Sequence, residues 1–363
     1  LDWGRLYWDW LTGHALPLWA DAGVDRAQGG FEELLGQDGL AVAAPRRARV
    51  QGRQSFVFAT AGSLGWDGPW REVAGLGLEY LERRYRRADG LYATLAGPDG
   101  AVIDQTAMTY DQCFALLAVA ALQLHGLGPG EAYALSLLDR IETLRRHPGG
   151  GFTEPGPRFL SNPHMHLLEA ALAWIEADGQ ARWRALAGEI VALALASFID
   201  REHGVLLERF DAAWAPAPGE AGDSVEPGHL FEWAWLLERW AGLGGGDEAH
   251  TAALLLFEAG RRSVDAARNV AIDETGRTLK PRRATARLWP QTERLKAALL
   301  LRQEDEARAA ARGLWQYLQT PRPGLWRDKM DADGHFVDEP APASSLYHII
   351  CAVASLKDYG TLT

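Results

Sequence analysis

Six glycine-punctuated loops at regular intervals constrain the fold of this 363-residue chain more than any other feature. Each loop opens with a small residue and an apolar neighbour, continues as a short extended run and usually ends in a turn. The opening residues are Gly30, Gly90, Gly151, Gly204, Asn269 and Gly324. Their separations are 60, 61, 53, 65 and 55 residues, which is a six-fold repeat. Glycine and asparagine tolerate left-handed backbone, and the extended runs predict small β-hairpins.

Each interval between loops leaves room for two helices. The first helices are predicted to begin near Gln51, Met108, Pro163, Gly228, Leu288 and Ser344, and the second helices to span 69–87, 128–147, 180–200, 248–266, 304–319 and 4–21. Three first helices are apolar on all sides, as in CFALLAVAAL, which is typical of helices inside a structure. The second helices carry polar faces. This pattern predicts an all-α (α/α)6 barrel, a single domain over residues 1–363, with short β-hairpins in the long loops on one face.

Charge and composition narrow the class of protein. A formal net charge of −11 without a long basic run argues against a nucleic-acid partner, and we interpret Arg46, Arg47 and Arg49 as a solvated edge. Cys113 and Cys351 are the only cysteines, which favours a reducing compartment. The first twenty residues indicate an amphipathic helix, and no apolar run reaches membrane-spanning length. We therefore expect a soluble, cytoplasmic protein with no membrane partner.

One polar residue on each predicted inner helix lies at a similar distance from the opening residue of its loop. The offsets are 23, 20, 15, 25, 24 and 24 residues for Arg53, Tyr110, His166, His229, Glu293 and His348. Because the long loops meet the N-termini of the inner helices, these side chains are expected to converge on one cavity there. Each residue alone has a structural interpretation, but the six-fold recurrence favours a functional one.

The histidines are the candidates for acid–base chemistry, because imidazole titrates near neutral pH. A lone histidine among apolar residues, such as His348, is more often a hydrogen-bonded core residue, but together with His229 the catalytic interpretation is favoured. His164 and His166 are two residues apart on a helix and point in different directions, and we expect His166 to face the cavity. No HExxH, paired CxxC, Walker or dinucleotide signature is present, so neither a metal nor a cofactor is expected.

Six stretches carry a family resemblance. QGRQSFVFA, TYDQCFALLA, NPHMHLLEA, EPGHLFEWAWLL, RLWPQTERLKA and SSLYHIICAV together resemble the N-acylglucosamine 2-epimerase superfamily, and the GHLFEW and LYH segments are most similar to its mannose isomerase branch. The resemblance implies an (α/α)6 barrel in which His348 and His229 are catalytic. The predicted substrate-binding residues are Arg53, Tyr110, Asn162, His166, Glu232, Trp289 and Glu293. Members commonly carry an arginine shortly before the GH pair, whereas this chain has none between Arg209 and His229.

The resemblance implies interconversion of an aldose and a ketose of the mannose and fructose type through an enediolate. His348 is expected to take the C2 proton, and His229 to handle oxygen protons and ring opening. Glu232 lies one helical turn from His229 and is expected to hold its ring. The expected partner is a small sugar, and the protein is expected to be a monomer or a homodimer.

Other functions stay open at this stage. A sugar 2-epimerase, of the N-acylglucosamine or glucose/mannose type, would use the same residues. A mannose-6-phosphate isomerase would need a phosphate site, and a glycoside hydrolase would need two carboxylates, here Glu232 and Glu293. The candidates for a phosphate site are Lys280, Arg282, Arg283 and Arg287, which otherwise form a solvated basic loop. A sugar-binding protein without catalysis is the last alternative.

Overall fold

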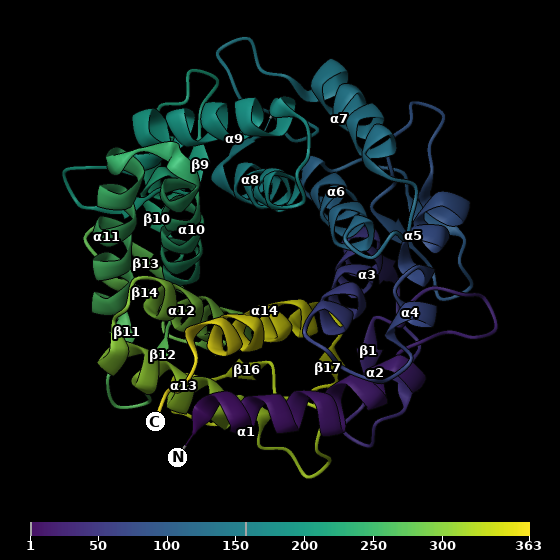
Figure 1. Cartoon of the computed structure of the whole chain (residues 1–363). Coiled ribbons are helices and arrows are strands. Elements are labelled where there is room, and N and C mark those ends of the chain that lie inside the picture. The colour runs from purple at the N-terminus through teal and green to yellow at the C-terminus, as the bar shows by residue number, and fades with distance from the viewer. Residues whose placement is uncertain (1, 157) are drawn as a thin grey trace.

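Two concentric rings of helices make up the fold in residues 2–156 and 158–363, which the computed structural model describes (Figure 1). The inner ring consists of α3 (Ala48–Ser63), α6 (Thr109–Gln123), α8 (Ser161–Glu176), α10 (Pro227–Trp240), α12 (Leu288–Leu300) and α14 (Ser344–Tyr359). Each inner helix contacts the next, and α14 packs against α3 to close the ring. The inner helices begin within three residues of the predicted positions, which confirms the (α/α)6 barrel.

The outer ring covers the inner one with amphipathic helices. It consists of α1 (Trp3–Trp10), α2 (Leu16–Asp21), α4 (Trp70–Val73), α5 (Leu76–Tyr80), α7 (Glu131–Arg145), α9 (Ala181–Leu193), α11 (Asp247–Arg262) and α13 (Glu304–Leu318). A π-helical turn joins α1 to α2. The helix predicted over 69–87 is instead broken between α4 and α5. In the first turn of α5, Gly77 packs so closely on α3 that a Cβ would lie 2.0 Å from the Gln51 carbonyl oxygen.

The long loops contribute short antiparallel strands that tie neighbouring loops together. The strands are β1 (Leu34–Leu35), β2 (Ala41–Val42), β3 (Arg46–Arg47), β4 (Leu95–Ala96), β5 (Val102–Asp104), β6 (Phe159–Leu160), β7 (Ile199–Asp200), β8 (Val205–Leu206), β9 (Arg209–Phe210), β10 (Ser224–Val225), β11 (Val264–Asp265), β12 (Val270–Ala271), β13 (Glu274–Gly276), β14 (Pro281–Arg283), β15 (Ala286–Arg287), β16 (Lys329–Met330) and β17 (Ala341–Pro342). The pairs β1–β2, β4–β5 and β13–β14 form the expected hairpins. Pairing of β17 with β1 joins the last loop to the first.

On each of four inner helices, one buried side chain is hydrogen-bonded to the backbone at the start of a loop. Each accepts a backbone N–H at 2.8 Å, in the pairs Gln51–Phe31, Gln112–Tyr92, His164–Phe152 and Gln291–Ala271. Gly30 and Gly151 precede two of these donors at φ of +77° and +73°, and a Cβ on either would lie within 2.7 Å of the tying side chain. His164 therefore occupies a structural position that glutamine fills elsewhere, and it points away from His166.

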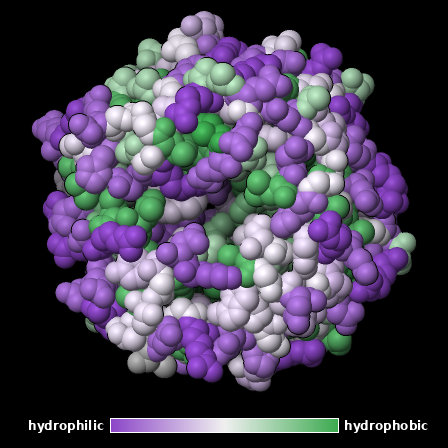
Figure 2. Space-filling model, in the orientation of Figure 1, coloured by the Kyte–Doolittle hydropathy of each residue, from purple (hydrophilic) through white to green (hydrophobic). Residues whose placement is uncertain are grey.

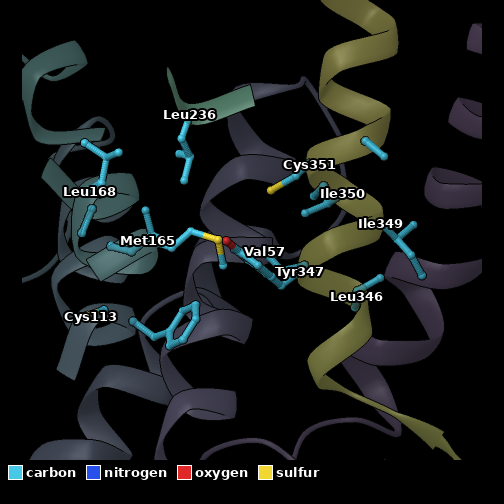
Figure 3. Packing of buried hydrophobic residues seen from close by; sticks show 14 of the residues in the cluster. Val57, Cys113, Met165, Leu168, Leu236, Leu346, Tyr347, Ile349, Ile350 and Cys351 are labelled. Carbon is cyan, nitrogen blue, oxygen red and sulfur yellow. The ribbon is translucent and has the colours of Figure 1, made fainter. Parts of the chain in front are cut away.

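Apolar side chains of the inner helices close the axis of the ring. Figure 3 shows Met165, Tyr347, Cys351 and Leu236 pointing toward one another between the helices, and all of them are buried. In the orientation of Figure 1 the surface is mainly hydrophilic, with hydrophobic residues gathered around a central hollow (Figure 2). None of the helices in the described residues is both long and apolar enough to cross a membrane.

Candidate active site

A cavity of about 500 Å³ lies at the N-terminal ends of the inner helices, where the loops converge. Every inner helix contributes to its wall, and the predicted residues that line it are Arg53, Tyr110, Asn162, His166, His229, Glu232, Trp289 and His348. The structure thus brings eight of the nine predicted site residues to one place. Glu293 is the exception, because it is fully buried behind His348 instead of lining the cavity.

His348 is hydrogen-bonded to Glu293 through one ring nitrogen, and its other ring nitrogen takes no part in that contact. Its Nδ1 lies 2.9 Å from Glu293 Oε1, and the second carboxylate oxygen accepts from Lys296 Nζ at 2.7 Å. An ionised carboxylate only accepts, so Nδ1 carries the proton and Nε2 keeps its lone pair. Burial lowers the pKa of His348 to about 4, although the contact with Glu293 opposes this. At neutral pH His348 is therefore a neutral base.

His229 makes the same kind of contact, but to a residue that the sequence did not single out. Its Nδ1 donates to Glu208 Oε2 at 2.9 Å. Burial works to lower the pKa of His229, but the charges of Glu208 and Glu226 outweigh it and raise the value to about 10. His229 is therefore an imidazolium at neutral pH. The prediction that Glu232 holds this ring is wrong, because His229 Nδ1 binds Glu208 on the preceding loop, and Glu232 Oε1 has no hydrogen-bond partner among the described residues.

Glu208 was missed because it lies in a loop, 21 residues before the histidine that it binds. The repeat nevertheless contains a signal. Glu208 stands four residues after Gly204, and acidic residues, Asp273 and Asp328, stand four residues after the opening residues of the next two loops. Aligning the six loops on their opening residues would have marked this position as one where an acid recurs beside the inner helices.

Glu232 lies instead beside His166, at the bottom of the cavity. His166 Nδ1 donates to Glu169 Oε2 at 3.1 Å and is 3.9 Å from Glu232 Oε1. Burial lowers the pKa of His166 to about 4, so this ring is also neutral. Burial and the nearby Glu293 raise the pKa of Glu232 well above its usual range. Glu232 Oε1 has no hydrogen-bond partner among the described atoms, which makes it available to a ligand.

Arg53 is a buried cation whose charge no acidic side chain among the described residues neutralises directly. It is 5% exposed and donates through Nη2 to the Tyr110 hydroxyl at 2.9 Å. Its guanidinium lies over the rings of Phe114 and Tyr347, at 4.2 and 4.8 Å from their centroids. Rings stabilise the cation without satisfying its donors, and Nε has no partner in the described part of the chain. Such a group can bind an oxygen that becomes negative during a reaction.

Trp289 forms the wall between the two predicted catalytic histidines. Its ring centroid lies 5.1 Å from that of His229 and 5.7 Å from that of His348. Gly228 makes room for the indole, because a Cβ there would lie 2.4 Å from the ring. A flat aromatic face of this kind is suited to the apolar side of a sugar ring. Asn162 adds a carbonyl oxygen, Oδ1, that is buried and unpaired among the described atoms.

Basic residues at the mouth of the cavity are already paired with acids. The pairs are Arg47–Glu33, Arg49–Asp111, Arg287–Asp273, Arg287–Glu226 and Lys329–Glu339. The interpretation of Arg46, Arg47 and Arg49 as a solvated edge is wrong. Arg46 is 4% exposed and binds Asp25 at 2.7 Å, while the other two line the cavity. Their acidic partners, Asp25, Glu32 and Glu33 earlier in the same loop and Asp111 on α6, reach them only in the folded chain, which sequence spacing does not reveal.

The basic cluster before α12 divides in the structure. Arg287 lines the cavity, whereas Arg282 and Arg283 lie on β14 and pair with Asp223 and Glu274. Within the described residues, only one member of the predicted phosphate-binding cluster is thus among the residues lining the cavity.

Three groups, buried except for the half-buried Glu226, combine a histidine with two carboxylates whose ligand atoms lie within 4.8 Å of one another. They are His166–Glu169–Glu232, Glu208–Glu226–His229 and Glu232–Glu293–His348. In each group the Nδ1 nearest the carboxylates is hydrogen-bonded to one of them and carries a proton, so it offers no lone pair to a metal. The chemistry of these groups is that of histidine–carboxylate pairs, and the expected independence from metals stays a prediction.

Comparisons with known proteins agree with this geometry. The family model described as N-acylglucosamine 2-epimerase matches residues 29–352. A mannose-6-phosphate isomerase of Rhizobium meliloti (strain 1021) is 46% identical, over 96% of this chain and 95% of that protein. A D-mannose isomerase structure superposes with a TM-score of 0.87 at 20% identity, and the match covers 98% of this chain and 98% of that one. A cellobiose 2-epimerase structure from Bacillus thermoamylovorans B4167 superposes with a TM-score of 0.86 at 17% identity, and the match covers 98% of this chain and 99% of that one. This chain belongs to the N-acylglucosamine 2-epimerase family of sugar isomerases and epimerases.

Proposed function

We propose that this enzyme interconverts a mannose-type aldose and the corresponding fructose-type ketose. One observation carries the proposal. A single cavity holds His348, a neutral base, and His229, a charged acid, on two sides of Trp289. Proton transfer between adjacent carbons of a sugar needs a base for the carbon and an acid for the oxygens, both available at the same pH.

The reaction follows from these protonation states. His229 gives a proton to the ring oxygen and takes the proton of O1, which opens the sugar and leaves His229 charged again. His348 Nε2 then takes the C2 proton of the open-chain aldose. The electrons of that bond form the C1–C2 double bond, and O1 becomes negative beside Arg53. His229 protonates O1 and, now neutral, takes the O2 proton, while His348 returns its proton to C1. The electrons of the O2–H bond form the C2 carbonyl, and those of the C1–C2 double bond form the new C1–H bond of the ketose. Both histidines end in their starting states, so no oxidant or reductant is consumed.

A 2-epimerase would use the same residues, with the proton returned to the opposite face of C2. The relatives' names support the isomerase. The protein that is 46% identical is called a mannose-6-phosphate isomerase, and a protein with 24% identity over 63% of this chain is called a D-mannose isomerase. The hydrolase alternative is less well supported, because Glu293 binds Lys296 and His348 instead of lining the cavity.

The same reaction on a 6-phosphorylated hexose is the second candidate. It is favoured by the name of the 46% identical relative and by Arg47, Arg49 and Arg287 at the cavity. The observation against it is that each of these arginines already pairs with a carboxylate. A phosphate dianion would have to displace an acid or share its partner, whereas an uncharged hydroxyl would not.

Product analysis with mannose, mannose 6-phosphate, N-acetylglucosamine and cellobiose tests the proposal. We expect mannose to give fructose, and in D2O we expect the recovered mannose to acquire deuterium at C2. Conversion of the phosphorylated sugar with much higher kcat/KM would favour the second candidate. Glucose as the product of mannose, or N-acetylmannosamine from N-acetylglucosamine, would establish an epimerase, and release of glucose from cellobiose a hydrolase. Absence of turnover with every sugar would remove the proposal.

A further inference from the structure

We propose that Lys296 is a positioning residue for His348, acting through Glu293 to hold the imidazole in its base form. The role rests on the proposed function, in which His348 takes a carbon-bound proton. Lys296 does not line the cavity and is fully buried, so any effect on the reaction must pass through its neighbours.

The contacts form a linear chain from α12 to α14. Lys296 Nζ donates to Glu293 Oε2 at 2.7 Å, and Glu293 Oε1 accepts from His348 Nδ1 at 2.9 Å. Lys296 follows Glu293 by one helical turn, so the two side chains share a face of α12. The ammonium also lies 3.8 Å from the ring centroid of Trp235 on α10. These contacts place the lysine directly against the carboxylate that fixes the histidine tautomer.

The charges around Lys296 explain why Glu293 needs it. Glu232 on α10 and Glu169 on α8 are both buried near this ammonium. The other charged and titratable groups near the Lys296–Glu293 pair include Cys351 and Tyr347 on α14 and Arg53 on α3. Burial works to raise the pKa of Glu293, but Lys296 and His348 hold it below its usual range. Glu293 is thus kept as an anion among other carboxylates by a cation on its own helix.

A purely structural lysine at this place would be costly. Burying an ion pair usually stabilises a fold no more than packed apolar residues of the same volume would. Lys296 has a second effect, however, because its positive charge and its hold on Glu293 both resist proton uptake by the His348–Glu293 pair. Without the ammonium, the pair binds a proton at higher pH, whether the proton settles on the imidazole or on the carboxyl. Either form of the protonated pair lacks the free base that the reaction uses.

Histidine titration by NMR tests the inference without any substrate. Protein labelled with ¹⁵N-histidine is titrated from pH 4 to 9, and the His348 signals are assigned by their loss in His348→Asn. In Lys296→Met we expect the pair to take up its proton about 1–3 pH units higher than in the parent. Lys296→Arg keeps the charge and should restore most of the parent titration. Lys296→Gln, which keeps a donor near Glu293, should shift as the methionine variant does, so the test survives poor folding of one variant.

Lys357→Met is the matched control. Lys357 lies on α14, the helix of His348, and its ammonium is 4.6 Å from the ring centroid of Trp8, as that of Lys296 lies over Trp235, but Lys357 is exposed. It should leave the His348 titration unchanged. If the neutral Lys296 variants titrate like the parent, the lysine has only a structural role and the inference fails. In an active parent, the acid limb of kcat should move with the NMR titration while KM changes little. A parent without isomerase activity would instead overturn the proposed function, and the titration would still decide the role of Lys296.

Discussion

The His229 and His348 halves of the site use the same contact and reach opposite protonation states. Each histidine is almost fully buried and donates from Nδ1 to a glutamate at 2.9 Å. Nevertheless, the pKa of His229 is raised to about 10 and that of His348 is lowered to about 4. The direct hydrogen bond therefore does not decide the charge of either ring.

The difference lies in what surrounds each pair. Glu226 adds a second negative charge beside His229, whereas Lys296 offsets the charge of Glu293 beside His348, and Arg53 adds a further positive charge there. Because burial alone lowers the pKa of any histidine, one extra carboxylate or one extra cation selects the acid or the base. The comparison shows that an acid and a base can be built from identical pairs when the neighbouring charges differ.

Replacing each histidine by asparagine should produce the largest effects and test the division of labour. His348→Asn is expected to lose about 10²–10⁴ in kcat and to abolish exchange of the substrate C2 hydrogen with solvent. His229→Asn should also slow turnover strongly, yet retain slow C2 exchange on substrate that is already open. Deuterium incorporation measured by NMR in D2O separates the two. Parent-rate exchange in His348→Asn, with none in His229→Asn, would show that the roles are reversed.

Replacing Glu208 by glutamine should lower the pKa of His229 and so bring it closer to the pKa of His348. The glutamine carbonyl still accepts the Nδ1 proton, but the loss of negative charge lowers the pKa of His229. Since His229 acts in its charged form, the alkaline limb of kcat/KM should move to lower pH by about 1–3 units. Glu232→Gln is the comparison, because His229 Nδ1 binds Glu208 and not Glu232, so this variant should shift the limb less. A larger shift in Glu232→Gln would show that Glu232 is the main partner of His229, as the sequence predicted.

The two histidines should also impose opposite pH dependences on the free energy of unfolding. For His348 the pKa is about 4 when folded and about 6.5 when unfolded, so only the unfolded state binds a proton between these values and stability rises with pH. For His229 the folded pKa of about 10 is the higher one, so its contribution is present below pH 6.5 and lost toward pH 10.

The asparagine variants isolate these two slopes. His348→Asn is expected to remove a rise of about 1 kcal/mol per pH unit between pH 4 and 6.5, and His229→Asn a fall of the same order between pH 6.5 and 10. Urea unfolding of the parent and both variants across pH 4–10 measures them. Equal slopes in all three proteins would mean that folding shifts the pKa of neither ring.

The smallest effect is expected for His164→Gln, which marks the boundary between structural and functional histidines. His164 accepts from Phe152 N–H and contacts the Leu160 carbonyl through Nδ1. Gln112 and Gln291 make the same two kinds of contact in their own repeats. We expect stability within about 1 kcal/mol of the parent and activity within a few-fold, measured by urea unfolding and initial rates. A loss as large as that of His348→Asn would place His164 in the reaction.

The fold was predictable from the sequence because the repeat recurs six times and three of the inner helices are apolar all round. The common cavity was predictable for the same reason, since each repeat delivers its polar residue at a similar depth. The pairing of Glu232 with His229 failed because proximity along a helix does not determine which partner lies across the barrel. Glu208 reaches His229 from a preceding loop, and such a contact depends on how the rings of helices set the loops side by side.

The protonation states of His229 and His348 could not be predicted from the sequence for a related reason. His229 and His348 both lie on inner helices and both are followed by apolar residues, so nothing local separates an acid from a base. Lys296 and Glu226 decide the difference, and each acts by its place in three dimensions. The arginines at the start of α3 were misread in the same way, because the acids that bind them lie 14 to 62 residues away along the chain.

The buried side chains that bind the first residues of the loops are expected to keep those loops from opening independently of the barrel. Loop amides usually exchange their hydrogens with solvent quickly, because they open without unfolding the domain. The amides of Phe31, Tyr92, Phe152 and Ala271 donate instead to buried groups on the inner helices. Their exchange should therefore be as slow as that of the helices themselves. The walls of the cavity then persist as long as the barrel does, so a sugar meets a site that is already assembled.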